Sequence, residues 1–357
     1  MSSIPAKKIE LFCGTGGVGK TTLSASRALY LASQDKKVLL ITIDPARRLK
    51  EILNLQEENS GNIETIPSSF FTGFADDKEF SFDALLMSPA KTLARMGERH
   101  DTTQGFDNPI IKILTRPHGG MNEILAIIEV QQQLQENIYD CIILDTPPGK
   151  HFIDFLQGTE KIRQFFDKSF IDIFKFLGKP VKQEQTSRGF LSLLIKSGVK
   201  KLLSFLEKVT GKNFVDSFID AIIALYNNKD SFLTAISFQN QLKEKTFSNW
   251  FLVTSVEQQK TGEAEDMQKT ASRLMHDDNF MAINKSLSPY LKSWNTDHAT
   301  PFLKELKTSM LSREAILLEY AKNNFENTID FPEILDNSPG VHVVELAKRW
   351  SQLNDQQ

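Results

Sequence analysis

The sequence predicts an α/β protein with a mostly parallel sheet and an inserted helical subdomain. Three observations carry this prediction. A glycine-rich loop joins a strand pattern to a helix pattern within residues 9–32. Strand-like apolar runs then alternate with helical ones, which is typical of parallel strands joined by crossover helices. Between Thr159 and Lys245 we find only helical periodicity, and this gap predicts the inserted subdomain.

Seven short apolar runs have the length and the flanking turn residues expected of strands. They are Ile9–Cys13, Val38–Ile43, Phe82–Met87, Tyr139–Leu144, Phe251–Thr254, Phe280–Ile283 and Val341–Val344. We therefore expect a core formed by residues 1–88, 118–158 and 246–357. Residues 159–245, together with 89–117, are expected to form the helical subdomain.

The composition is that of a globular chain. Its 357 residues are 40% hydrophobic and carry a formal net charge of −3, so bulk charge gives no attraction to nucleic acid. No uninterrupted apolar run reaches the roughly 18 residues of a transmembrane helix. Cys13 and Cys141 both fall in predicted core strands, which argues against a disulfide framework and favours a cytoplasmic location.

The glycine-rich loop matches the pattern G-x-x-x-x-G-K-[ST] between a strand and a helix. In this pattern the glycines let backbone N–H groups approach phosphates, and the helix N-terminus adds partial positive charge. Lys20 is expected to reach the β- and γ-phosphates, and the Thr21 hydroxyl to hold Mg²⁺. The expected nucleotide-binding residues of the loop are Gly14, Thr15, Gly16, Gly17, Val18, Gly19, Lys20, Thr21 and Thr22. The sequence therefore predicts that the chain binds a nucleoside triphosphate.

Two aspartates follow predicted strands, at the carboxyl edge where α/β sheets bind ligands. Asp44 opens an Asp-Pro-Ala-Arg-Arg segment, and a carboxylate there can orient or deprotonate an attacking water. A plain Asp-Pro turn is the alternative for Asp44. Asp145 ends the strand 139–144, and a strand ending in aspartate beside a phosphate-binding loop favours a Mg²⁺ ligand.

Together these segments resemble the ArsA-type ATPases, which include arsenite-pump ATPases and the factor that delivers tail-anchored membrane proteins. The family's glycine loop, Asp-Pro-Ala switch I and Asp-Thr-x-Pro-x-x-His switch II match Gly14–Thr22, Asp44–Ala46 and Asp145–His151. More loosely, Asn284 lies where the family places an adenine-contacting asparagine, and Val341–Leu346 resembles its closing strand. The resemblance implies a P-loop NTPase fold of the deviant-Walker type.

The resemblance also implies a Mg²⁺-dependent ATPase whose nucleotide cycle rearranges a dimer. Lys20 would bind phosphate and act in catalysis with Asp44, which serves the attacking water. Thr21 and Asp145 would hold the magnesium, and Asn284 would contact the base.

The residues after Asn284 bear on the choice of nucleotide. Asn284-Lys285-Ser286-Leu287 begins like the guanine-reading Asn-Lys-x-Asp motif but has Leu287 in place of the aspartate. A guanine would leave its ring donors unpaired, which costs roughly 1–3 kcal/mol. We therefore expect ATP in preference to GTP.

Two departures from the family are informative. Thr15 occupies the position of a signature lysine that reaches the partner's phosphates, and losing such a cation can cost on the order of 10³-fold in rate. Hydrolysis is then slow, or another cation substitutes (Arg47, Arg48 and Lys150 are candidates), or a paralogue supplies the lysine in a heterodimer. The family's Cys-x-x-Cys zinc pair is also absent. With only two thiols, the chain lacks the several soft ligands that a metalloid needs, so we expect no metalloid.

A phenylalanine-rich, basic stretch characterises the predicted subdomain. Fifteen of the 26 phenylalanines lie between His151 and Phe251, and residues 175–212 carry nine Lys or Arg against two Glu. Such a stretch can contact an anionic membrane surface or line a groove for an apolar client helix. A helical subdomain that packs its own core is the alternative.

These features leave two hypotheses about function. The leading one is a cytoplasmic ATPase, a homodimer or a heterodimer with a paralogue, that handles a hydrophobic protein segment or a membrane surface through residues 159–245. The second is a slow regulatory nucleotide switch that recruits protein partners and binds no apolar client.

Overall fold

The computed structural model describes residues 4–43, 48–99, 108–115, 121–165, 208–209 and 212–355. The chain divides into two compact units. The first comprises Met1–Met87, Val130–Gln157 and Phe238–Gln357, and the second comprises Ser88–Glu129 and Gly158–Ser237.

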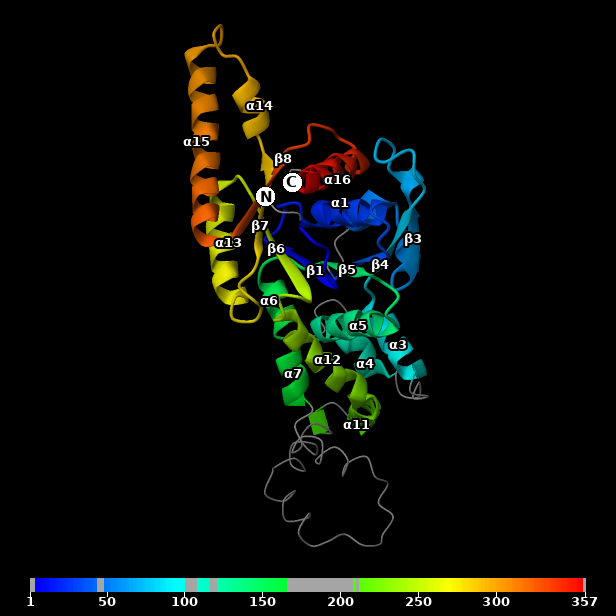
Figure 1. The fold of residues 1–357 in the computed structure, drawn as a ribbon. Helices are drawn as coiled ribbons and strands as arrows, with labels where there is room; N and C mark the ends of the chain where they lie inside the picture. Colours follow the sequence, from blue (N-terminus) through cyan, green and yellow to red (C-terminus); the bar gives the residue numbers. More distant parts are fainter. Residues whose placement is uncertain are drawn as a thin grey trace, which may run out of the picture. The chain divides into compact units, whose positions relative to one another are not determined.

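An eight-stranded sheet forms the centre of the first unit (Figure 1). Its strands are β1 (Ile9–Gly14), β2 (Val38–Thr42), β3 (Ile63–Pro67), β4 (Ser81–Leu86), β5 (Cys141–Asp145), β6 (Ser248–Ser255), β7 (Phe280–Ser286) and β8 (Asn327–Pro332). Their order is β3-β4-β2-β5-β1-β6-β7-β8, and every neighbouring pair is parallel except β3 and β4. The predicted α/β class with a mostly parallel sheet is confirmed.

The central strands are buried along their whole length. β1, β2, β5 and β6 contain only buried residues, as expected of parallel strands covered on both faces. β1 lies between β5 and β6, and the chain leaves it first toward β2 on one side and only later toward β6 on the other. The carboxyl end of β1 is therefore the point where the strand order reverses and where open α/β sheets bind ligands.

Helices of the first unit cover this sheet. They are α1 (Lys20–Ser33), α2 (Arg48–Leu53), α6 (Lys150–Leu156), α13 (Gln258–Ala271), α14 (Ser288–Ser293), α15 (Pro301–Asn324) and α16 (Pro339–Asp355). Figure 1 shows α1 and α16 side by side, and the two are in contact. α13 packs on β6, and α15 packs on α13, α14 and β8. Short 3₁₀ turns at Glu57–Asn59 and Ser68–Phe70 flank β3.

The prediction of a closing strand at Val341–Val344 is wrong, because these residues lie in helix α16. Buried residues recur in α16 at helical spacing: Val343, Val344, Leu346, Ala347, Trp350 and Leu353. Its Trp350 ring packs 5.6 Å from Phe251 of β6 and 4.7 Å from Phe331 of β8. The closing strand is β8. The sequence does not predict it, because Asn, Asp and Pro residues are all disfavoured in strands. The edge strand β3 escapes prediction because only Ile66 in it is buried.

A buried ion pair lies beneath this helical layer. Arg27 of α1 donates from Nε and Nη2 to the two carboxylate oxygens of Glu10 at 2.9 and 3.0 Å. Both side chains are fully buried. Asn249 donates to the same carboxylate at 3.0 Å, and the guanidinium lies 4.9 Å from the Trp350 ring. The pair thus connects β1, α1, β6 and α16 in the core of the first unit.

Replacing Glu10 with alanine is expected to destabilise the first unit strongly. The substitution leaves the Arg27 charge buried without its carboxylate, which costs about 3–5 kcal/mol. Urea unfolding followed by circular dichroism measures the change. Glu265→Ala serves as the control, because it breaks the exposed pair with Lys269 and should cost less than about 1 kcal/mol. Equal losses in the two variants would contradict the structural role of the buried pair.

The described part of the second unit is helical. It contains α3 (Pro89–Arg99), α4 (Pro109–Leu114), α7 (Gly158–Phe165) and α11 (Lys212–Asn227). α5 (Asn122–Glu136) and α12 (Lys229–Leu242) cross from one unit into the other. Asn108 caps α4 and donates to the Ser217 carbonyl of α11 at 2.7 Å. None of the described helices has the length and apolar character needed to span a membrane.

The first half of α5 belongs to the second unit, although the sequence-based division assigned residues 118–158 to the core. A buried acid bonds α5 to α3 within this unit. Glu129 of α5 accepts a hydrogen bond from Thr92 of α3 at 2.5 Å, and it forms an ion pair with Arg95, which also lies on α3. Such polar contacts are not visible in hydrophobic periodicity.

Candidate functional site

The glycine loop joins the carboxyl end of β1 to the first turn of α1. Glycine is required at Gly14 and Gly19 by both the backbone conformation and the available space. 

At Gly14 the backbone φ is +153°, and an added Cβ would lie 2.2 Å from the Val253 carbonyl oxygen of β6. At Gly19 φ is +93°, and an added Cβ would lie 2.2 Å from Nδ2 of Asn284. Because only glycine fits at both positions, the loop can follow the neighbouring strands closely and turn its N–H groups outward from the start of α1.

A cavity of about 380 Å³ opens in front of this loop. This volume is in the range of small-molecule sites. Its walls come from the loop and α1, from the start of α2, from the segment after β5, from the ends of β7 and β8, and from α16. The lining residues are Gly16, Gly17, Gly19, Lys20, Thr21, Thr22, Arg48, Pro148, Asn284, Lys285, Pro332, Glu333, Ile334, His342 and Leu346. Most of the predicted loop residues therefore face one cavity, together with the predicted Asn284.

Lys20 and Thr21 lie at the head of α1. The Lys20 side chain is largely buried and folds back over the loop, where Nζ donates to the Thr15 carbonyl at 2.9 Å. The Thr21 hydroxyl donates to Oδ2 of Asp145 at 2.8 Å. Thr42 at the end of β2 donates to the same oxygen at 3.0 Å. Two residues 124 positions apart in the sequence, Thr21 and Asp145, are thus brought into direct contact, as a shared metal site requires.

The donor set at this point fits Mg²⁺. The ion prefers hard oxygen ligands and is usually held by one or two carboxylates together with substrate phosphates and water. Asp145 is only 2% exposed and supplies the carboxylate. Since the Thr21 hydroxyl gives its hydrogen to Asp145, its lone pairs remain available to a cation. These two residues can therefore hold a magnesium ion that also binds a phosphate group.

Asn284 of β7 also lines the cavity and lies against the glycine loop. It is buried, and its Nδ2 donates to the Val18 carbonyl of the glycine loop at 2.9 Å. One hydrogen of the amide nitrogen is therefore used within the protein and fixes the side chain, and Oδ1 can accept a hydrogen bond from a ligand. The site consequently combines a cation and a metal-binding pair at Lys20, Thr21 and Asp145 with a hydrogen-bond acceptor at Asn284.

The two predicted switch segments are described to different extents. Asp44 and Arg47 lie outside the described residues. After β5, the Gly149 N–H donates to the Gly14 carbonyl at 3.1 Å, so this segment contacts the glycine loop. Pro148 lines the cavity, whereas the side chain of His151 is 57% exposed.

The predicted substitutes for the missing lysine also differ in their positions. Arg48 lines the cavity, and Lys150 is exposed at the start of α6. Sequence reasoning missed a further cation, Lys260 in the first turn of α13. Lys260 donates to Glu263 at 2.9 Å, and this contact, together with the Thr15 side chain, lowers the pKa of the Glu263 carboxyl. Its position in the sequence could have indicated it, because Lys260 follows β6, and β6 pairs with the end of β1 at Gly14.

Both thiols are buried and free. Cys13 lies on β1 and Cys141 on β5, as expected. Burial raises the pKa of the Cys13 thiol to about 12 and that of Cys141 well above its ordinary value. Because the thiolate is the form that binds soft metals and metalloids, these two groups are poor ligands where they lie.

The strand, the glycine loop and the helix N-terminus at the carboxyl edge of a parallel sheet define the P-loop class of nucleotide-binding proteins. Within this class, a family profile described as anion-transporting ATPase, ArsA_ATPase, matches residues 7–308. The chain belongs to this family, and the resemblance read from its motifs is confirmed.

Individual relatives are similar at moderate identity. The putative arsenical pump-driving ATPase 2 of Aquifex aeolicus (strain VF5) is 28% identical over 188 residues, which is 50% of this chain and 60% of the relative. ATPase get3 of Schizosaccharomyces pombe is 33% identical over 151 residues, 40% of each protein. ATPase GET3 of Kluyveromyces lactis is 29% identical over 238 residues, 63% of this chain and 67% of the relative. The chain spans about half the length of the first curated relatives that it matches, between 40% and 60% of each.

Proposed function

We propose that this protein is a Mg²⁺-dependent ATPase that binds its nucleotide in the cavity beside the glycine loop. The observation that carries this proposal is the contact between Thr21 and Asp145 at the head of α1, next to the Lys20 ammonium. Membership of the ArsA_ATPase family supports the same activity. When bound, magnesium would neutralise charge on the phosphates, with Thr21 and Asp145 as its protein ligands.

The residues around the cavity divide the work on the nucleotide. The loop N–H groups would bind the phosphate oxygens, and Lys20 would exchange the Thr15 carbonyl for the β- and γ-phosphates. Arg48 adds a second positive charge at the same cavity. Asp44, whose role comes from the family resemblance, would orient the attacking water.

Asn284 would select the base. Since Nδ2 of Asn284 is bonded to the Val18 carbonyl, its Oδ1 would accept from the 6-amino group of adenine. Guanine and hypoxanthine carry an oxygen at this position, and two acceptors would face each other. The arrangement therefore favours ATP over both GTP and ITP.

Asn284→Asp is expected to raise the KM for ATP by about tenfold or more. The new carboxylate would place an acceptor against the Val18 carbonyl and remove the bond that fixes the side chain, at a cost of about 1–3 kcal/mol. Steady-state hydrolysis with ATP and with ITP measures the effect. Asn295→Asp, in the loop after α14 and not among the cavity residues, is the control. If Asn284→Asp hydrolyses ATP with the wild-type KM, Asn284 does not read the base.

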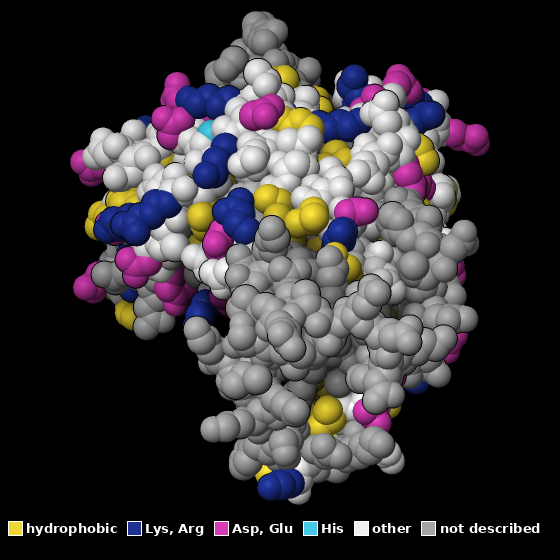
Figure 2. Space-filling view, turned by 90° about the horizontal axis from the view of Figure 1, so that it is seen from below, with side chains coloured by type: hydrophobic (Ala, Val, Ile, Leu, Met, Phe, Trp, Pro, Cys, Tyr) yellow, Lys and Arg dark blue, Asp and Glu magenta, His cyan; other side chains and the backbone are white. Residues whose placement is uncertain are grey.

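We further propose that the nucleotide cycle rearranges a dimer and is coupled to a hydrophobic protein segment or a membrane surface. Support comes from the family resemblance and from the basic, phenylalanine-rich stretch within residues 159–245, of which residues 166–207 and 210–211 lie outside the described residues. On the face shown in Figure 2, the described Lys and Arg side chains are interspersed with Asp and Glu. Residues 175–212, with nine Lys or Arg against two Glu, would supply positive charge for an anionic membrane. A cytoplasmic location is part of the same proposal.

A slow regulatory switch is the second candidate, and Thr15 is the observation that favours it. Threonine cannot supply the charge that the family's lysine carries to the partner's phosphates. Asp44→Asn, expressed in native cells to prolong the ATP-bound state, separates the two candidates by the proteins that co-purify. Proteins with a single apolar helix would support the client function. Recovery of only a related ATPase or of soluble regulators would support the switch.

A further inference from the structure

A buried carboxylate on α15 binds the chain at the carboxyl end of β7, directly after Asn284 and Lys285. Glu314 is 3% exposed and accepts hydrogen bonds from three successive residues. Ser286 Oγ donates at 2.8 Å, the Leu287 N–H at 2.7 Å and the Ser288 N–H at 3.0 Å, and the Ser288 hydroxyl also donates to the same carboxylate. Charged acceptors form stronger hydrogen bonds than neutral ones, so this cluster fixes residues 286–288 firmly to α15.

The segment that Glu314 holds follows an irregularity in the sheet. The pairing of β7 with β8 shifts its register between Ile283 and Ser286, so that the intervening residues bulge. Lys285 within this bulge has φ of +62°, a conformation that non-glycine residues rarely adopt. Bulges redirect side chains near functional sites. Here the redirected residues are Asn284 and Lys285, both of which line the nucleotide cavity.

The strained residue is held from both sides. On its amino side Asn284 is bonded to the Val18 carbonyl of the glycine loop, and on its carboxyl side Ser286 is bonded to Glu314. Unfavourable backbone conformations persist only where the surroundings fix them. Neither Val18 nor Glu314 is near Lys285 in sequence, so the bulge depends on two separate anchors.

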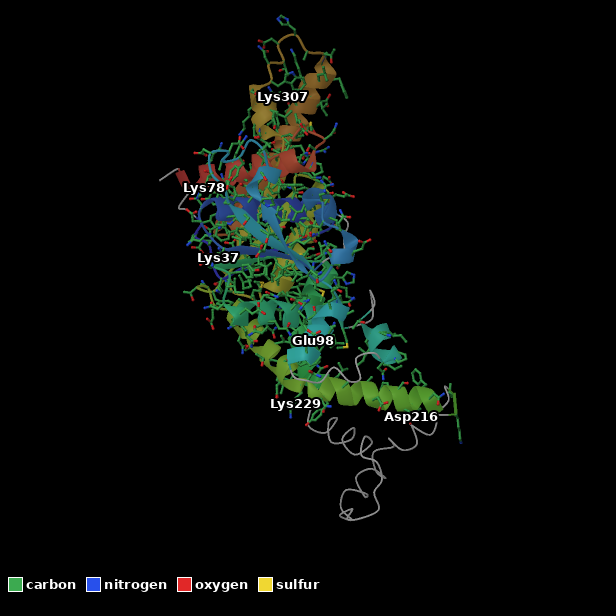
Figure 3. All side chains as sticks on the ribbon, turned by 90° about the vertical axis from the view of Figure 1, so that its right-hand side faces the viewer. Lys37, Lys78, Glu98, Asp216, Lys229 and Lys307 are labelled. Carbon is green, nitrogen blue, oxygen red and sulfur yellow. The ribbon has the colours of Figure 1, made fainter. Side chains whose placement is uncertain are left out.

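The helix that carries Glu314 is itself well placed as an anchor. Thr300 caps its N-terminus, and Leu317 and Ala321 are buried on the same side as Glu314, three and seven residues further on. Lys307, labelled in Figure 3, donates from α15 to the Trp294 carbonyl at the end of α14 at 2.6 Å. α15 is thus bonded to both ends of α14, through Glu314 at Ser288 and through Lys307 at Trp294.

We propose that Glu314 is a positioning residue that sets base discrimination by holding Asn284 and Lys285 in their bulged conformation. The inference rests on the proposed ATP-binding function and extends it to a residue outside the cavity. Glu314 would act through residues 284–288 and would not touch the nucleotide. Loosening this anchor should let the Asn284 side chain rotate and lose its preference for a donor at position 6 of the base.

The test is the ratio of the KM for ITP to the KM for ATP. A partly unfolded sample contains less active enzyme and lowers the maximal rate with both nucleotides, but it leaves this KM ratio unchanged. Glu314→Gln keeps the size of the side chain but turns an NH₂ group toward the serine and backbone donors. We expect the ratio to fall by about fivefold, the factor that one hydrogen bond typically contributes. Because the anchor is remote from Lys20 and Thr21, kcat for ATP should remain close to that of the wild type.

Two further variants complete the experiment. Ser286→Ala removes a single bond to Glu314 and should lower the ratio in the same direction, even if Glu314→Gln does not fold. Glu319→Gln, on an exposed position of the same helix, should leave it unchanged. A wild-type ratio in a folded Glu314→Gln variant, or in Ser286→Ala, overturns the role of Glu314 while leaving the ATPase function intact. A wild-type protein that does not distinguish ATP from ITP overturns both this role and base reading by Asn284.

Discussion

Lys20→Ala should reduce ATP hydrolysis to the level of a protein-free blank, a loss of at least about 10²- to 10³-fold. Lys20 is the first residue of α1, and its ammonium group lies 2.9 Å from the Thr15 carbonyl of the loop. Without this group, the positive charge that would neutralise the phosphates is lost. Release of inorganic phosphate from ATP, followed under steady-state conditions, measures the loss.

The variant must be shown to be folded, and Lys36→Ala provides the comparison. Lys36 is exposed beyond the end of α1, and its removal should leave the rate unchanged. Thermal unfolding of both variants should resemble that of the wild type. If Lys20→Ala keeps the wild-type rate, the measured activity comes from a contaminant or from another site.

Asp145→Asn should lower kcat for ATP by about a hundredfold or more and raise the Mg²⁺ concentration needed for half-maximal rate. The asparagine keeps the shape of the side chain but removes the negative charge, so the affinity for a hard cation falls. Its NH₂ group would also meet the hydroxyls of Thr21 and Thr42, which donate to Asp145 in the native structure. Titration of the rate with MgCl₂ at fixed ATP measures both effects.

Asp154→Asn is the matched control for this substitution. Asp154 lies on α6, where it makes a weak charged contact with His151 at 4.0 Å. Its removal should leave the Mg²⁺ dependence as in the wild type. An Asp145→Asn variant that requires no more Mg²⁺ than the wild type would show that Asp145 does not hold the metal.

The parts of the fold that sequence predicts well are those with a local signal. The strands of the sheet centre are apolar runs between turn residues, and the glycine loop is a motif whose spacing follows from phosphate binding. The α16 error has a physical cause, because the valines at its start favour strands while burial at helical spacing continues to Leu353. β8 has the opposite problem, since its Asn327, Asp330 and Pro332 disfavour strand formation and pairing with β7 overrides that preference.

The site is predictable to the same extent. Lys20, Thr21 and Asp145 follow from motifs, and the structure brings them together. Glu314 and Lys260 do not, since their significance depends on contacts between distant segments, with residues 286–288 and with Glu263 beside Thr15. A buried carboxylate with several donors has no periodicity or motif that would distinguish it from a surface glutamate of the same helix.

The measurement we would make first is single-turnover hydrolysis of ATP by the purified 357-residue chain, with MgCl₂ and with EDTA. We expect phosphate to be released only in the presence of Mg²⁺, at a slow rate if no cation replaces the one missing at Thr15, and not by Lys20→Ala. If the wild-type chain binds no ATP at millimolar concentration, or releases phosphate equally in EDTA, the site at Lys20, Thr21 and Asp145 is not that of a Mg²⁺-dependent ATPase.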